Sequence, residues 1–440
     1  MNGLETRRFV LKILCDSSNI FKKKLLDETI QQHNFSAVDR SFIMELVQGI
    51  TKRERTLSYL MNKYSRHASP DNTIRNIVYI GLYQLLFTEI APYAAINTTV
   101  ELAKSQKLGK VSSYINGLLR NVQRSISKID TVQDNASILP LEIGGWKFSK
   151  EIFPNPISEL SLYLATVYSF PEILVKQWLK KYGKEQCKLL LQSANKIAPV
   201  FIRDRQGKLV DILREKNIAY TIYNDLYKLE NASDLFQLPP FEQGLWTVNG
   251  TTSAEVIRCL NPQPNMKILD LCAAPGGKTL QIIDKIQGNG LVVAMDISEK
   301  RLQLLKKLGN LPCLQIKIGD GTQDYIEYQE FFDQVLVDAP CSNSAVFSKR
   351  ADARHRFSMQ NLQSLNKIQS LLLESAAKMV KVGGVLLYST CSIEDSENRE
   401  QIELFLKKHL EFKCIEQHEI IPLAPTLDGG SFCKLVKCGL

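Results

Sequence analysis

The stretch ILDLCAAPGGKT, residues 268–279, decides how the second half of the chain folds. Four strand-like residues run into a loop of small residues, and an apolar helical pattern follows them. A strand that ends on such a loop and restarts as a helix is typical of the front edge of a nucleotide-type pocket. The spacing is neither that of a P-loop nor G-x-G-x-x-G, so a purely structural turn remains the alternative reading of this stretch alone.

From residue 266 onward, strand patterns alternate with helix patterns. Strands are predicted at 267–271, 291–296, 314–318, 334–337 and 385–389, and two late segments, 412–414 and 433–437, are expected to close the edge of the sheet. Alternating strands and helices predict a doubly wound, mostly parallel sheet. We therefore expect an α/β Rossmann-like domain over residues 247–440.

Two acidic residues follow strands of this sheet. Asp296 ends the second strand, where a carboxylate can accept hydrogen bonds from ribose hydroxyls, and Asp320 follows the third, within reach of an adenine amino group. The alternative for each is a helix cap or a loop acid. No second phosphate-holding element is visible, so S-adenosylmethionine is the predicted cofactor. Its predicted binding residues are Cys272, Ala273, Ala274, Pro275, Gly276, Gly277, Lys278, Asp296, Asp320 and Asp338.

Two cysteines follow the next two strands. VLVDAPCSNS, residues 335–344, carries Asp338 and Cys341, and LLYSTCSIEDSEN, residues 386–398, carries Cys391. The Ser392–Asp395 spacing predicts a capping box, which would place Cys391 beside a helix N-terminus, where a thiolate is favoured. Both thiols are expected to converge on one crevice. The alternative is a pair of ordinary buried thiols, and the residues alone do not say which one reacts.

Residues 1–126 read as an all-helical domain. They contribute most of the net charge of +9, because residues 1–130 hold 19 lysines and arginines against 11 acidic residues. A basic module on a near-neutral body suggests binding to a polyanion, and a solvated helical surface is the alternative. The segments SAVDRSFIMELVQGITKRERTLSYLMNKY, IRNIVYIGLYQLLF, AAINTTVELAK and INGLLRNV resemble, in this order, the NusB-type RNA-binding fold. Candidate RNA contacts are Arg7, Arg8, Lys22, Lys23 and Lys24.

The middle of the chain divides into two segments. Prolines and the Gly144-Gly145 pair break periodicity over 127–168, which predicts a linker, and its apolar content predicts that it packs on another element. Residues 169–246 read as a small α+β RNA-binding subdomain. Its predicted helices are 173–181 and 185–194, and its predicted strands are 200–203, 219–222 and 226–229.

ILDLCAAPGGKT, VDAPCS and YSTCSIEDSEN, in this order, resemble the Sun/Fmu group of bacterial RNA cytosine-5 methyltransferases. With the NusB-like front, the resemblance covers nearly the whole chain. It implies methyl transfer from S-adenosylmethionine to carbon 5 of a cytidine in small-subunit (16S) ribosomal RNA. It assigns the nucleophile to Cys391 and product release to Cys341. It also implies that Asp338 holds the cytosine edge and that Lys278 lies between cofactor and base.

One loop departs from that family pattern. Where the family has glycine-threonine-glycine, this chain has Asn343-Ser344-Ala345, and Ala351 stands where proline is usual. The change puts loop geometry and activity in question, so a non-catalytic RNA-binding or assembly factor is the alternative function. The loop keeps basic residues near Phe347 and Phe357, which suits RNA contacts, although a solvated basic loop is the alternative. The predicted RNA-binding residues are Lys349, Arg350, Arg354 and Arg356.

Composition sets further expectations. The chain has no run of about 18 apolar residues that could span a membrane, and its first residues do not look like a secretory signal. Its ten cysteines are scattered without C-x-x-C spacing, so neither a metal site nor a disulfide framework is expected. We expect a monomeric, cytoplasmic protein with free thiols.

Overall fold

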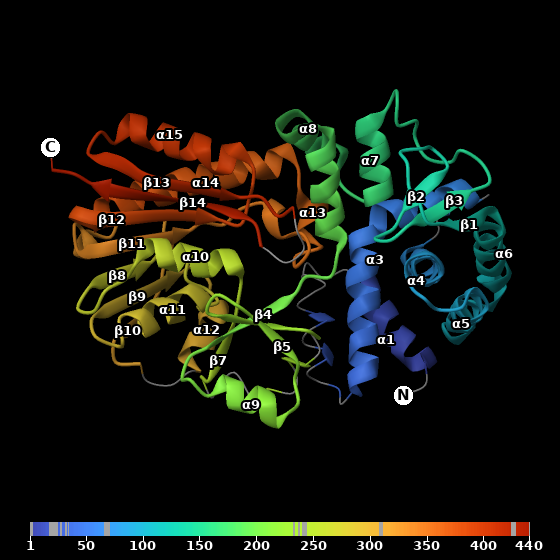
Figure 1. Cartoon of the computed structure of the whole chain (residues 1–440), viewed down its shortest axis with the longest axis horizontal. Coiled ribbons are helices and arrows are strands. Elements are labelled where there is room, and N and C mark those ends of the chain that lie inside the picture. Colours follow the sequence, from blue (N-terminus) through green and yellow to red (C-terminus); the bar gives the residue numbers. More distant parts are fainter. Residues whose placement is uncertain are drawn as a thin grey trace. The chain divides into compact units, whose positions relative to one another are not determined.

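The computed structural model describes residues 3–16, 25–26, 29–30, 33, 35–65, 71–231, 234–235, 238–239, 244–307, 311–423 and 428–439 (Figure 1). The chain forms two compact units. The first comprises Met1–Lys196 together with Arg350–Arg356, and the second comprises Ile197–Lys349 together with Phe357–Leu440. The chain therefore leaves the second unit once, for seven residues, before returning to it.

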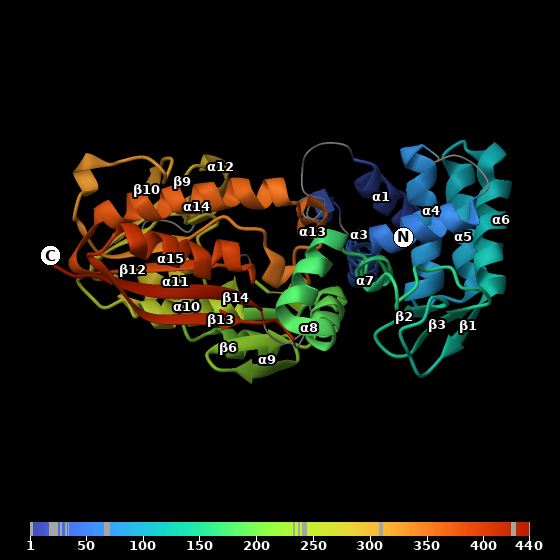
Figure 2. The same cartoon turned by 90° about the horizontal axis from the view of Figure 1, so that it is seen from above.

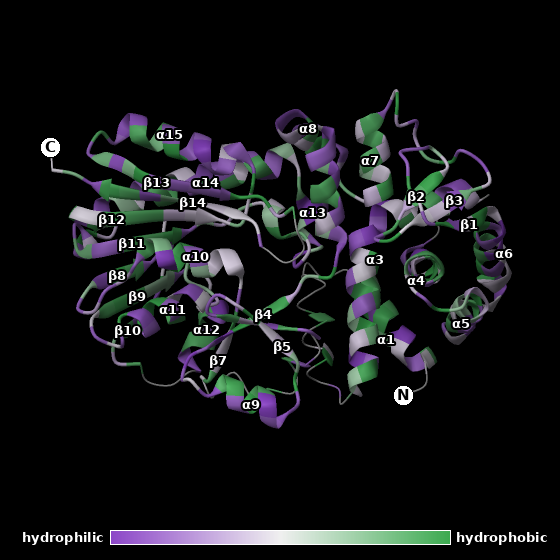
Figure 3. Cartoon of the chain, viewed as in Figure 1, coloured by the Kyte–Doolittle hydropathy of each residue, from purple (hydrophilic) through white to green (hydrophobic). Residues whose placement is uncertain are grey.

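The first unit begins with a helical bundle. Its helices are α1 (Gly3–Cys15), α3 (Ala37–Tyr64), α4 (Asn72–Phe87), α5 (Pro92–Ser105) and α6 (Gly109–Ser125). As expected from its apolar sequence, α4 is buried over most of its length and is largely hydrophobic (Figure 3). The apolar spacing predicts separate helices over 37–51 and 55–64, but α3 is continuous, and Lys52 at the predicted break is a buried helical residue. The apolar spacing also predicts a helix at Phe21–Ile30, which lies mostly outside the described residues.

The segment 127–168 is more ordered than a linker. It contributes to a small antiparallel sheet of β1 (Ile126–Ile129), β3 (Gly145–Phe148) and β2 (Ile138–Pro140), in that order, and to helix α7 (Leu160–Tyr168). Its apolar side chains pack as expected. Phe148 and Phe153 are buried against each other, and the indole of Trp146 donates to the Leu86 carbonyl at 2.8 Å.

Helix α8 (Glu172–Asn195) belongs to the first unit, although the sequence grouped it with the strands that follow. It packs on α7, and Asn195 donates to the Tyr168 carbonyl at 2.7 Å. Gly183, at φ +74°, kinks the helix, which explains why the sequence pattern reads as two helices. The strands belong to the second unit as a separate sheet in the order β5 (Tyr220–Tyr223), β6 (Leu226–Leu229), β4 (Val200–Asp204) and β7 (Trp246–Asn249), with α9 (Leu209–Glu215) packed beside it.

The rest of the second unit is the expected Rossmann-like domain. Its main sheet runs in the order β10 (Leu314–Ile318), β9 (Leu291–Asp296), β8 (Lys267–Asp270), β11 (Phe332–Asp338), β12 (Val380–Thr390), β14 (Gly430–Lys437) and β13 (Phe412–Ile420). The first five strands are parallel, and β14 and β13 close the edge as an antiparallel hairpin. All the strands predicted from the sequence are present.

Helices cover both faces of this sheet (Figure 1 and Figure 2). One face packs on α14 (Met359–Met379) and α15 (Arg399–Lys408). The other packs on α10 (Thr251–Leu260), α11 (Gly277–Lys285) and α12 (Glu299–Lys306). Successive strand residues serve opposite faces: Leu269 faces α14 and α15, whereas Ile268 faces α10 and α11. Burial on both faces is why these strands read as continuous apolar runs.

Candidate functional site

The loops that carry the sequence motifs meet at one edge of the main sheet. β8 lies between β9 and β11 and runs parallel to both, and β11 runs parallel to β12. The carboxyl ends of parallel strands share one edge, and strand order reverses beside β8, where ligands bind in doubly wound folds. The structure thus brings together the glycine loop, Asp296, Asp338 and both cysteine loops.

The glycine loop has a backbone that only glycine adopts at low cost. Gly276 has φ +107°, and a Cβ there would lie 2.3 Å from a methyl of Leu305. Helix α11 begins directly after it, at Gly277, where a Cβ would meet no other atom within 4 Å. The loop is therefore tightly packed on one side and open at the start of the helix, as a ligand cradle requires.

Asp270 ends β8 underneath this loop. It is 1 % exposed, and its Oδ2 accepts a hydrogen bond from the Thr279 hydroxyl at 2.7 Å. Its Oδ1 is buried without a hydrogen-bond partner among the described residues. Burial raises the pKa of Asp270 to about 7, and the neighbouring carboxylates of Asp338 and Asp296 add to that rise. An orphaned carboxylate oxygen among other carboxylates suits a cationic ligand.

Asp296 and Asp320 lie where the sequence placed them, at the ends of β9 and β10. The carboxylate of Asp296 is buried and accepts from the backbone N–H groups of Ala274 at 3.0 Å and Ser298 at 2.8 Å. It is thereby fixed against the glycine loop, and each of its oxygens keeps a lone pair for a further donor. Asp320 is partly exposed, and its Oδ1 accepts from the Thr322 N–H and hydroxyl. These residues fit an adenosine-bearing sulfonium cofactor.

Lys278 and Asp338 form an ion pair from the start of α11 to the end of β11. The distance from Nζ to Oδ2 is 2.5 Å, and the hydroxyl of Ser389 donates to the other Asp338 oxygen at 2.9 Å. Burial alone would lower the pKa of Lys278, but attraction to Asp338 and nearby Cys391 outweighs it, so the pKa is raised. The ammonium group therefore stays charged and is held at the edge of the cysteine site.

The thiols of the two cysteines are hydrogen-bonded to each other, with their Sγ atoms 3.2 Å apart. Cys341 is buried, whereas Cys391 is partly exposed. The side chain of Asn343 lies against both residues: its Nδ2 donates to the Cys341 carbonyl at 2.8 Å, and its Oδ1 accepts from the Cys391 thiol at 3.2 Å. The hydrogen bond with Cys391 and burial raise the pKa of Cys341 well above its ordinary value.

Glu397 joins the two cysteine loops, a role that the sequence reading missed. It is fully buried, and it accepts from the Ser342 N–H at 2.8 Å, from Gln369 at 3.0 Å and from the hydroxyls of Ser342 and Ser392. The expected capping box of Ser392 and Asp395 does not form, because Ser392 turns toward Glu397 and α15 starts only at Arg399. The only signal in the sequence was the presence of an acidic residue at this position of the YSTCSIEDSEN motif.

The predicted RNA-binding residues separate into two groups. Arg354 is 0 % exposed, and its guanidinium donates to the carbonyls of Lys52 and Ala194 and to Asn195 Oδ1, all in the first unit. This corrects the prediction: Arg354 is structural, because its side chain is buried and both terminal guanidinium nitrogens donate to oxygens of the first unit. Arg350 and Arg356 are exposed, and Lys349 is engaged with Asp428 at 2.7 Å.

Other residues expected at an RNA surface are also buried. Phe347 and Phe357 are at most 7 % exposed, so neither offers a ring for base stacking. Arg7 is buried and donates to Gln84 at 2.8 Å, whereas Arg8 is exposed. Lys22, Lys23 and Lys24 lie outside the described residues.

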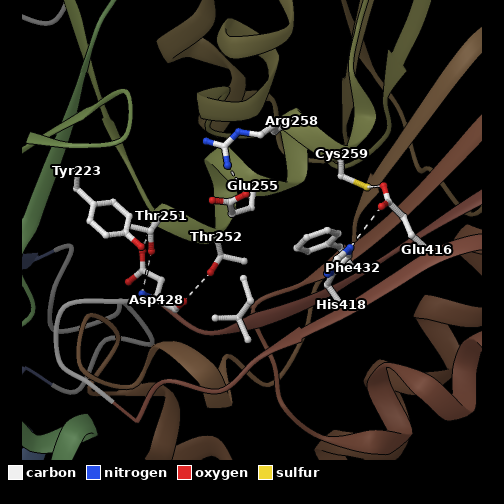
Figure 4. A pocket seen from close by; sticks show the side chains of 11 residues that line it. Tyr223, Thr251, Thr252, Glu255, Arg258, Cys259, Glu416, His418, Asp428 and Phe432 are labelled. Carbon is white, nitrogen blue, oxygen red and sulfur yellow. Dashed lines mark hydrogen bonds and ion pairs between the residues drawn. The ribbon is translucent and has the colours of Figure 1, made fainter.

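A cavity of about 390 Å³ lies elsewhere in the second unit, between α10 and the β13–β14 hairpin (Figure 4). Its walls include Glu255, Arg258, His418 and Phe432, and none of the predicted catalytic or cofactor-binding residues lines it.

In the described part of the chain, no helix is long and apolar enough to cross a membrane, and no cluster of side chains is suited to a metal ion.

Comparison with known proteins agrees with this arrangement. Residues 257–425 match the model of the 16S rRNA methyltransferase RsmB/F family, and residues 4–124 match the NusB family. The chain is 33% identical over 407 residues to a probable ribosomal RNA small subunit methyltransferase B of Synechocystis, covering 88% of this chain and 85% of that protein. It is 31% identical to ribosomal RNA small subunit methyltransferase B of Escherichia coli K12, covering 92% of each. The crystal structure of PH0851 superposes with a TM-score of 0.80 at 22% identity, over 99% of both chains.

Proposed function

The chain belongs to the RsmB/F family of 16S rRNA methyltransferases, and from this premise we propose that it methylates carbon 5 of a cytidine through a covalent cysteine–base intermediate. The observation that carries the proposal is the contact between Cys341 and Cys391 beside the Lys278–Asp338 ion pair. Methylation of an exocyclic or ring nitrogen does not require a nucleophilic thiol, so it would not explain two thiols in one crevice.

The chemistry requires a nucleophile because carbon 5 of cytosine is too poor in electrons to accept a methyl group directly. Addition of a thiolate to carbon 6 forms a C–S bond and converts the ring to an enamine, whose carbon 5 would take the methyl group while the methyl–sulfonium bond breaks and leaves a neutral thioether. Loss of the carbon 5 proton then breaks the C–S bond and restores the ring. The target base must leave its stack or lie in a single-stranded region.

The surroundings of the two thiols support different roles for them. Cys391 is partly exposed and can approach a base, which suits the nucleophile. Cys341 is buried, and its pKa is raised by the hydrogen bond with Cys391 and by burial, so it is the poorer nucleophile and suits the release step. The Asp338 carboxylate, held by Lys278 and Ser389, is positioned for the polar edge of the base.

S-adenosylmethionine is the proposed cofactor, and it would supply an electrophilic methyl group on a positively charged sulfur. Asp296 would accept from its ribose, and Asp320 would accept from its adenine. Gly276 and Gly277 allow its close approach to the backbone. The carboxylate of Asp270 beneath the loop would favour its positive charge, because Oδ1 has no other described partner.

A transfer assay tests the proposal. Wild type, Cys391→Ala and Cys341→Ala are incubated with S-adenosylmethionine carrying a labelled methyl group and with small-subunit RNA. We expect transfer to carbon 5 by wild type and none by Cys391→Ala. We expect Cys341→Ala to accumulate a covalent protein–RNA adduct that resists denaturation. Full activity of Cys391→Ala would reject the assigned nucleophile.

The altered loop raises the second candidate function, a non-catalytic RNA-binding or assembly factor. The same assay separates the two functions. Wild-type protein that binds small-subunit RNA but transfers no methyl group, under conditions in which an active family member turns over, would favour the factor. Retention of both thiols, Lys278 and Asp338 favours the enzyme.

A further inference from the structure

Asn343 stands where the family pattern has glycine, and its amide lies between the two cysteine loops. Its backbone has φ +61° and ψ 25°, in the left-handed region that glycine adopts freely and that asparagine tolerates better than most residues. The substitution therefore keeps the turn and adds a side chain to the site. That side chain is the feature that distinguishes this chain at the cysteine pair.

The orientation of the amide is fixed by its contacts. Nδ2 must point to the Cys341 carbonyl, at 2.8 Å, because a carbonyl oxygen only accepts. Oδ1 then faces the Cys391 sulfur at 3.2 Å and can only accept from its S–H. Oδ1 thus stabilises the protonated thiol of Cys391 and would repel a thiolate in the same position.

We propose that Asn343 is a positioning residue that holds Cys391 as an aligned thiol in the resting protein, so that the nucleophile becomes more reactive when Asn343 releases it. This rests on the proposed function, in which Cys391 is the nucleophile. The target cytosine is the group that displaces the Asn343 amide, because its carbon 6 must reach the Cys391 sulfur.

Other charged and titratable groups around Cys391 act in parallel. Cys341 contributes a thiol at 3.2 Å, the Lys278 ammonium attracts a thiolate, Asp338 neutralises part of that attraction, and Glu397 faces the neighbouring Cys341. The side chains of these groups stay in place when the Asn343 side chain is removed, and among these residues only Cys341 loses a contact, because its carbonyl loses the Nδ2 donor. A change of thiol reactivity in such a variant therefore reports on the amide.

The test is the rate of alkylation of Cys391 by iodoacetamide between pH 6 and 10, read by peptide mass spectrometry on the full chain without RNA or cofactor. In Asn343→Gly the alkylation rate at pH 7 is expected to rise about two- to tenfold, which is the factor that corresponds to the net free energy of one hydrogen bond. The midpoint of the rate-against-pH curve is expected to move to lower pH. Because no methyl transfer is measured, failure of this test and failure of the proposed function are distinguishable.

Two matched variants keep the test specific. Asn217→Gly replaces an exposed asparagine at φ +51° in the same unit and is expected to leave the Cys391 rate unchanged. Ser344→Ala loosens the same loop, because the Ser344 hydroxyl meets Ser392 and the Ile393 N–H, but it leaves the amide on Cys391. An unchanged rate in Asn343→Gly, or an equal rise in Ser344→Ala, would overturn the proposal.

Discussion

Replacing Asp270 by asparagine is expected to stabilise the second unit above neutral pH. The pKa of this aspartate is about 7 in the folded protein, against 3.8 for an unperturbed group, chiefly because the side chain is buried. A folded pKa above the unfolded one means that the group's contribution to stability is fully present below about pH 4 and is lost as the pH rises through 7. A rise of about three pKa units corresponds to about 4 kcal/mol.

Asparagine is neutral at every pH and therefore escapes this loss. It can still accept from the Thr279 hydroxyl, but its NH2 would replace Oδ1, which has no described partner. An unsatisfied buried donor costs about 2 kcal/mol. We therefore expect Asp270→Asn to be about as stable as wild type near pH 5 and more stable by about 2 kcal/mol at pH 8.

Hydrogen exchange of β8 and β9 peptides in urea, from pH 5 to pH 8, measures this difference for the second unit by itself. Asp333→Asn is the control with opposite sign. Burial alone would raise the pKa of Asp333, but the hydrogen bond from the Lys267 N–H and the Lys381 ammonium outweigh it, so the pKa is lowered. The contribution of Asp333 to the stability of the folded protein is therefore lost as the pH falls. Parallel stability curves for wild type and Asp270→Asn would refute the reasoning.

Asp270→Asn is also expected to bind S-adenosylmethionine more weakly in calorimetric titrations, because the sulfonium loses a nearby carboxylate.

Three further changes have defined outcomes. Gly276→Ala is expected to lower the stability of the second unit by about 3 kcal/mol in urea unfolding, because alanine is strained at φ +107° and its Cβ would overlap Leu305. A variant as stable as wild type would contradict this expectation. Arg354→Ala is expected to destabilise the first unit by about 3 kcal/mol, because it removes the donors to the Ala194 carbonyl and to Asn195 Oδ1 and truncates a fully buried side chain. An unchanged thermal midpoint would refute the assigned role. Arg350→Ala is expected to reduce the salt dependence of RNA binding by about one ion, in fluorescence anisotropy titrations. Arg356→Ala and Lys349→Ala are expected to reduce it by less, because Asp352 and Asp428 already engage these side chains.

The sequence predicted the main sheet well because its strands are buried on both faces. Such strands read as short apolar runs between helices, and each acid or cysteine at a strand end then falls on one edge by topology. The sequence pattern predicted less well which elements pack against one another. The apolar face of α8 shows that it packs on something, but not that its partner is α7 in the first unit rather than β4 in the second.

Buried polar residues were the least predictable part of the site. Glu397 and Arg354 belong to residue types that are usually exposed, and a charged run such as SKRADARHR gives no sign of which member turns inward. Each is accommodated by partners distant in sequence. Glu397 collects donors from two loops about 50 residues apart, and Arg354 meets oxygens of α3 and of α8. Such partners exist only once the fold has formed.

The departure at Asn343-Ser344-Ala345 is compatible with an intact site, for reasons particular to each residue. Asn343 holds the left-handed turn, and the buried Ser344 bonds to Ser392 and to the Ile393 N–H. The N–H of Ala345 donates to the Cys391 carbonyl at 3.2 Å, and its own carbonyl accepts from Gly429 at 3.3 Å. The loop is thus tied to the Cys391 segment at three successive positions without the family's glycines. Because these hydrogen bonds hold the loop in place, the effect of the substitution is expected in the reactivity of the Cys391 thiol rather than in the shape of the crevice.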